Sequence, residues 1–166
     1  MTQQWACVLG LDNILLNNYW RKFYTYSQIG WDEEAIHQYL GQKKNIMQVA
    51  SFNTPVVNFS ASSRRNRFYT IYNQTRMLEQ DVPYEYCIEA LPKIMEKYKV
   101  YIISSRNKEL EAKTLEVMKR LGFPMDTMTI FFKKATEKLF NYQKKVMIQI
   151  TQTFPTGIRL CLNLNE

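Results

Sequence analysis

Apolar residues gather in four short runs along the chain, and each run passes directly into a polar segment. The first run, WACVL, leads into Gly10, Leu11 and Asp12. The predicted strands are residues 5–9, 100–103, 128–132 and 158–162. Short runs rich in β-branched and aromatic residues are typical of buried strands. They predict a parallel sheet whose carboxyl ends share one edge, where open α/β sheets bind their ligands.

Segments with helical spacing separate the later strands. Residues 81–97 have apolar positions at i, i+3 and i+7, and Pro83 suits the first turn of that helix. The next predicted helix is capped by Ser105 or Asn107 and ends at Gly122. The last predicted helix spans about 136–151. Strands and helices that alternate in this order predict an α/β fold with right-handed crossovers.

Residues 16–80 have a weaker and more mixed pattern than the rest. The segment begins with the aromatic and basic stretch YWRKFYTY. A helix is predicted at 31–40, where Asp32 caps the first turn and Gly41 ends the helix. A second helix is predicted at about 63–78. We interpret the segment as a mainly helical insertion into a single domain.

Composition narrows the class of protein without naming a partner. The chain has 166 residues, of which 46% are hydrophobic and 14% aromatic, so a folded domain is expected. The formal net charge is +7. Such a charge suits nucleic acid, an acidic membrane surface or an acidic protein partner, and it does not choose among them.

Cysteine and histidine usage excludes several chemistries. Cys7, Cys87 and Cys161 are widely spaced and odd in number, which favours buried free thiols in a reducing compartment. His37 is the single histidine, so a zinc site or a histidine-based nucleophile relay lacks its ligands. No apolar run approaches the roughly 18 residues of a membrane-spanning helix, and no leader pattern is seen. We therefore expect a soluble intracellular protein.

Four segments together carry a family resemblance. They are a strand ending in GLDNILL, a strand ending in SSR, a lysine-bearing helix, and a last strand that ends in polar residues after FPTGIRLCL. They resemble the four motifs of the haloacid dehalogenase-like (HAD-like) phosphatase superfamily. The resemblance covers residues 1–15 and 81–166. It implies a Rossmann-like three-layer α/β core with a central parallel sheet, and it sets residues 16–80 in the position of the family's helical cap.

The first family motif is Asp-x-Asp. Its first aspartate attacks phosphorus, its second serves as acid and base, and the motif helps to hold Mg²⁺. The resemblance puts Gly10 at the nucleophile position and Asp12 at the acid/base position. Because glycine has no side chain with which to attack, this implies a degenerate member. Asp12 and Asn13 have a simpler alternative role, which is to cap the following turn.

The second and third motifs bind the phosphoryl group. The hydroxyl of the second motif matches Ser104, with Ser105 as the neighbouring alternative. A capping role is again the simpler interpretation. The lysine of the third motif, which neutralises phosphate and nucleophile in the family, matches Lys144 or Lys145.

The fourth motif supplies acidic metal ligands in the family. Here the corresponding residues are Asn163 and Leu164, and Glu166 is the one nearby carboxylate. Since Mg²⁺ is usually held through one or two carboxylates, Asp12 alone would bind it poorly. We expect no cofactor, and Mg²⁺ only if activity remains.

These observations favour a catalytically inactive HAD-like protein that serves as a binding, regulatory or structural subunit with a protein partner. The alternative is a residual phosphatase or phosphate-binding hydrolase that uses Asp12, Ser104 and a lysine. A third hypothesis is nucleic-acid binding through Arg64, Arg65 and Arg67, which lie beside aromatic residues. A solvated helix face is the other interpretation of these arginines.

Overall fold

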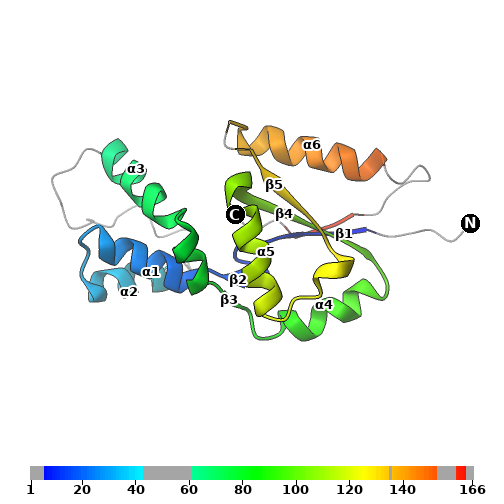
Figure 1. The fold of residues 1–166 in the computed structure, drawn as a ribbon, viewed down its shortest axis with the longest axis horizontal. Coiled ribbons are helices and arrows are strands. Elements are labelled where there is room, and N and C mark those ends of the chain that lie inside the picture. The colour runs from blue at the N-terminus through cyan, green and yellow to red at the C-terminus, as the bar shows by residue number, and fades with distance from the viewer. Residues whose placement is uncertain (1–5, 43–60, 135, 153–159, 164–166) are drawn as a thin grey trace, which may run out of the picture. The chain divides into compact units, whose positions relative to one another are not determined.

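A computed structural model describes residues 6–42, 61–134, 136–152 and 160–163 (Figure 1). The chain divides into two compact units, one formed by residues 1–17 and 82–166 and the other by residues 18–81. The predicted insertion, 16–80, and the second unit have nearly the same limits. That the whole chain acts as one domain stays a prediction, and each unit is described by itself.

The described residues of the first unit form a four-stranded parallel sheet in the order β5-β4-β1-β6. Its strands are β1 (Ala6–Gly10), β4 (Lys99–Asn107), β5 (Thr129–Lys133) and β6 (Leu160–Asn163). Leu9 of β1 lies between Ile102 and Asn163 in register. All five residues of β1 are buried, as expected for a central strand of a parallel sheet. The predicted α/β fold with a central parallel sheet is confirmed.

Helices cover both faces of this sheet (Figure 1). Leu9 and Ile102 pack in one apolar cluster with Met118 of α5 (Glu111–Arg120). The same cluster includes residues of α4 (Cys87–Met95). Val8 packs on the opposite face against Val146 of α6 (Leu139–Gln152). Successive residues of β1 thus point into different layers, because side chains alternate along a strand.

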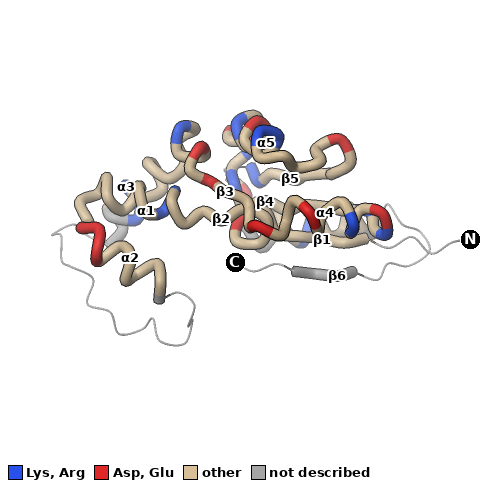
Figure 2. The backbone as a smooth tube through the Cα atoms, turned by 90° about the horizontal axis from the view of Figure 1, so that it is seen from below, with Lys and Arg blue, Asp and Glu red and all other residues tan. Residues whose placement is uncertain are grey.

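The described residues of the second unit are mainly helical. It contains α1 (Tyr19–Gln28), α2 (Glu33–Gln42), α3 (Ala61–Tyr72) and the 3-10 helix η2 (Thr75–Gln80). Phe23, Ile36 and Leu40 form its apolar cluster. The predicted cap of α2 is confirmed, because Ala35 N–H donates to Asp32 Oδ1 at 2.9 Å. Acidic residues stand at the start of that helix (Figure 2), where they face its positive end. The second predicted helix ends earlier than residue 78, at Tyr72.

The predicted helix at 81–97 begins later than expected. Val82 and Pro83 form the short strand β3, which pairs antiparallel with β2 (Leu16–Asn17). The helix α4 starts only at Cys87. Proline fixes its own φ and pushes the preceding residue toward extended backbone, so Val82-Pro83 suits a short strand as well as a helix start. In the folded chain, the pairing of Pro83 with Leu16 selects the strand over the helix.

The second predicted strand is longer than its apolar run. β4 continues through the polar residues 104–107, with an irregular register between Ser104 and Asn107. A 3-10 turn, η3 (Lys108–Leu110), then precedes α5. The predicted caps are wrong, because neither helix has a side-chain cap bond at its start. Ser104 and Asn107 still pair with Phe132 and Lys133 of β5, so the polar side chains of this segment did not end the strand.

Candidate functional site

The carboxyl end of β1 leads into a tight turn formed by residues 11–16. Leu15 N–H donates to Leu11 O at 3.1 Å, which closes the turn. Asn13 adopts a φ of +65°, in the left-handed region that asparagine tolerates better than most residues. This turn brings Asp12 to the carboxyl edge of the sheet.

Arg106 of β4 binds the carboxylate of Asp12 through two hydrogen bonds. Its Nε donates to Oδ2 at 3.1 Å, and its Nη2 donates to Oδ1 at 2.6 Å. The side chains of Arg106 and Asp12 are 3% and 14% exposed. A bidentate pair of guanidinium and carboxylate is among the strongest polar contacts in proteins. Both oxygens of Asp12 are therefore engaged by Arg106.

Two buried hydroxyl groups complete this network. Arg106 Nη1 donates to Thr114 Oγ1 of α5 at 3.2 Å, and the Arg106 backbone N–H donates to Ser104 Oγ at 3.2 Å. Ser104, Arg106 and Thr114 are all buried. We call Asp12, Ser104, Arg106 and Thr114 the Asp12–Arg106 network. The structure thus brings together two predicted site residues, Asp12 and Ser104, whereas Ser105 is exposed.

The described residues at this edge do not fit a Mg²⁺ ion. Gly10 has no side-chain ligand, and the carboxylate of Asp12 already holds a cationic guanidinium. A hard cation that bound this carboxylate would have to compete with Arg106 for its oxygens. Across the described parts of the chain, no three His, Cys, Asp or Glu side chains form a potential metal cluster. Glu166 and Leu164 lie outside the described residues, as does the side chain of Asn163.

The predicted phosphate-binding lysines lie on the solvent side of α6. Lys144 and Lys145 are exposed, while Tyr142, Val146 and Ile150 occupy the buried face. Lys145 Nζ lies 3.3 Å from Glu137 Oε1. Neither lysine takes part in the hydrogen bonds described above for the Asp12–Arg106 network. Their phosphate-binding role stays a prediction.

A different lysine stands at the carboxyl edge of the sheet. Lys133, the last residue of β5, pairs in register with Asn107 of β4, and its Nζ donates to Glu137 O at 3.1 Å. Sequence reasoning did not select Lys133 as a site residue, although it directly follows an apolar strand. The strand-then-polar rule that selected Asp12 and Ser104 also applies to Lys133.

The carboxylate of Glu137, beside Lys134 and Lys145, also accepts two hydrogen bonds. Lys134 N–H donates to its Oε2 at 3.1 Å, and Lys145 Nζ donates to Oε1. The backbone hydrogen bond from Lys134 lowers the pKa of Glu137, and the lysine charges act in the same direction.

The arginines of α3 belong to the second unit. Arg65 and Arg67 are exposed, and the side chain of Arg64 lies outside the described residues. Tyr69, on the same helix, is 49% exposed. Nucleic-acid binding through these residues stays a prediction.

A second cluster of buried polar side chains, centred on Arg21, was not anticipated from the sequence. Arg21 Nη1 lies 3.3 Å from Asp81 Oδ2, and the guanidinium stacks over the Tyr72 ring at 3.9 Å. Asn18 Nδ2 donates to the Tyr72 hydroxyl at 2.9 Å. These residues join the two ends of the helical unit. An arginine in the aromatic run YWRKFYTY was the available signal, since guanidinium groups stack on aromatic rings.

Solved structures resemble this chain in fold. A haloacid dehalogenase-like family hydrolase from Streptococcus pneumoniae gives a TM-score of 0.58 at 16% identity, with 96% of this chain and 76% of that one covered. A structure from Clostridium difficile described only as a candidate phosphatase gives 0.60 at 12% identity, with the same two shares covered. This is the HAD-like fold. No family model and no curated protein sequence matches the chain.

A further hydrolase from Streptococcus pneumoniae gives a TM-score of 0.51 at 11% identity, with 98% of this chain and 94% of that one covered. Identities this low establish the fold and leave the reaction open. Among the described helices, none combines the length and apolar character that a membrane span requires.

Proposed function

We propose that this protein is a HAD-like pseudophosphatase, which keeps the fold without the reaction and acts as a binding, regulatory or structural subunit. The observation that supports this most strongly is the bidentate pair of Asp12 and Arg106. It occupies the carboxyl edge of the sheet directly after Gly10, where the family's nucleophile would stand.

The chemistry of the edge residues supports the same conclusion. The family mechanism needs one carboxylate that attacks phosphorus and a second that exchanges a proton with the leaving group. Gly10 offers no attacking atom, and loss of a covalent nucleophile costs several powers of ten in rate. Protonation of Asp12 would leave the guanidinium of Arg106, which is 3% exposed, without its charged partner. Breaking such a buried pair costs about 3–5 kcal/mol.

The direct test is phosphomonoester hydrolysis by the full chain. Purified protein with Mg²⁺ should hydrolyse p-nitrophenyl phosphate and a panel of phosphomonoesters no faster than Mg²⁺ in buffer. Asp12→Asn, which keeps the shape of the side chain, should behave identically. Mg²⁺-dependent turnover that Asp12→Asn abolishes would contradict the proposal.

The subunit role has a separate test. A tagged full chain used as bait in native extract should retain a partner protein in a fixed ratio through gel filtration. Recovery of the chain without any stoichiometric protein would count against the subunit role and would leave the loss of catalysis unaffected.

A further inference from the structure

The outer edge of β5 is open within the described part of the sheet. The inner edge pairs with β4, with Ile130 beside Ile102, and no described strand pairs with the other edge. The strand reads TIFFK and carries no charge before Lys133. An apolar edge strand presents unpaired N–H and C=O groups, which form a template for another strand.

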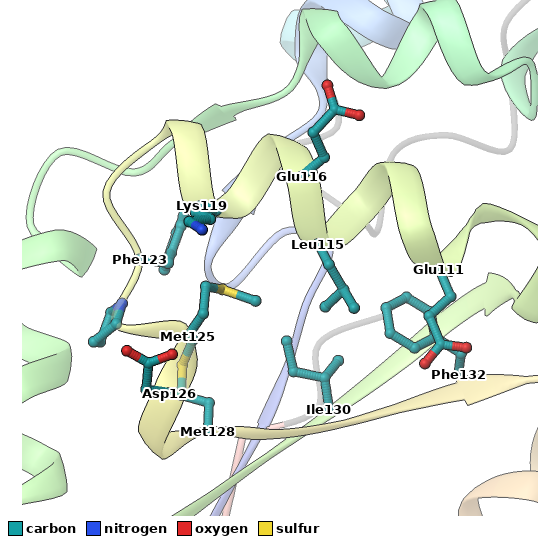
Figure 3. Close-up of a pocket in the computed structure, with 11 residues that line it drawn as sticks. Glu111, Leu115, Glu116, Lys119, Phe123, Met125, Asp126, Met128, Ile130 and Phe132 are labelled. Atoms are coloured by element: carbon teal, nitrogen blue, oxygen red, sulfur yellow. The ribbon is translucent and has the colours of Figure 1, made fainter.

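Apolar side chains stand on both faces of this strand. Ile130 and Phe132 line a groove of about 590 Å³ between β5 and α5, with Leu115 and Met128 beside them (Figure 3). Phe131 points to the opposite face and stacks on Tyr101, with ring centroids 6.2 Å apart. A strand added at this edge would therefore find apolar neighbours above and below its backbone.

The two ends of β5 carry opposite charges. Asp126 lies before the strand, in η4 (Met125–Thr127), and Lys133 and Lys134 end or follow it. A parallel copy of the same strand would set like charges together. An antiparallel copy sets the acidic entry of one strand near the basic exit of the other, so β5 is complementary to itself in that direction.

We propose that the outer edge of β5 pairs antiparallel with β5 of a second copy of this chain, about a two-fold axis at Phe131. In this register Thr129 faces Lys133 of the second copy, and Ile130 faces Phe132. Each pair occurs twice, because a two-fold interface is isologous. The two sheets become one, and both edges lose their unpaired backbone groups. The inference does not rest on the proposed function, since β5 contributes nothing to the Asp12–Arg106 network.

The test is sedimentation equilibrium of the full chain and of two matched variants. Wild-type protein should form a dimer. Thr129→Lys sets an ammonium group opposite Lys133 at two symmetry-related positions and should raise the dimer Kd roughly tenfold. Thr129→Glu changes the same half-buried position but sets a carboxylate there, so its Kd should be unchanged or lower. Circular dichroism should show the wild-type fold for both.

A charge exchange gives the decisive control. Thr129→Lys combined with Lys133→Glu should restore the dimer that Thr129→Lys weakens. A wild-type monomer at every concentration would overturn the proposal, as would equal weakening by the lysine and glutamate variants. A complex in which a strand of a different protein pairs with the outer edge of β5 would also overturn it.

Discussion

Among single residues, Arg106 determines how the Asp12 carboxylate is bound at the carboxyl edge of the sheet. Its guanidinium is almost fully buried, and its partner Asp12 is 14% exposed. Burial removes water from both charges, so the attraction within the pair largely offsets the cost of desolvation. The net contribution of such a pair to stability is modest, whereas removal of one partner leaves an expensive unpaired charge.

Asp12→Ala should lower the free energy of unfolding by about 3 kcal/mol, because Arg106 then lacks its carboxylate. Arg106→Met should cost less, since the Asp12 side chain retains some contact with water. The double variant should cost less than the sum of the two single changes. Urea unfolding measures all three, and strictly additive costs would show that the pair does not couple.

Glu137 should titrate below the ordinary glutamate pKa of about 4.3, because the folded chain donates hydrogen bonds to its carboxylate. A folded pKa below the unfolded one means that this contribution to stability is present above the unfolded pKa. It is lost as pH falls through the folded pKa. NMR titration of the Glu137 carboxyl carbon measures the midpoint. A midpoint at or above the ordinary value would refute the expectation.

At the scale of elements, local sequence predicted the end of α5 but not its start. Gly122 ends α5 as the sequence predicts, with a φ of +88°. Phe123 N–H donates back to Met118 O at 3.1 Å, which is a typical closure of a helix by a left-handed glycine. The start of α5, by contrast, has no side-chain cap, although two polar candidates were present.

Gly122→Ala should lower the free energy of unfolding by about 1 kcal/mol, because the left-handed backbone strains any residue with a Cβ. The site has open space around it, so strain rather than a clash is the cause. Gly41→Ala in α2 is the matched control, with equal space and no left-handed φ. It should leave stability unchanged or raise it. Equal losses in both variants would rule out the backbone explanation.

For the whole molecule, the chain passes from the first unit into the second and back through one short antiparallel pair. Leu16 lies opposite Pro83, and Asn17 lies opposite Val82. Residues 18–81 therefore leave and return at neighbouring positions of the first unit. An insertion with adjacent ends constrains its host little, which is common where domains are inserted into one another.

Replacement of residues 18–81 by Asn-Gly should leave the first unit folded, because a two-residue turn joins adjacent antiparallel strands. Heteronuclear NMR should show β1 and β4 chemical shifts like those of the full chain. Collapse of the spectrum to that of an unfolded chain would mean that the first unit needs the helical unit to fold.

Much of the sheet could be predicted because its strands are short buried runs bounded by polar residues. The parallel order followed from strands and helices that alternate along the chain. Val82-Pro83 was assigned to a helix instead, since its local preference allows both structures and Leu16, the strand partner of Pro83, is 67 residues away. The local backbone preference of a segment cannot distinguish a helix from a strand when a distant segment supplies the deciding hydrogen bonds.

The sequence by itself determined the α/β fold, the glycine at position 10 and the placement of Asp12 and Ser104 at one edge, because these depend on periodicity and on strand ends. Only the tertiary structure decided that Arg106 binds both oxygens of Asp12, that Lys133 lies beside Asn107, and that β5 is the outermost described strand. Side chains from different strands meet only once the sheet has formed, and their partners lie too far along the chain for local patterns to identify.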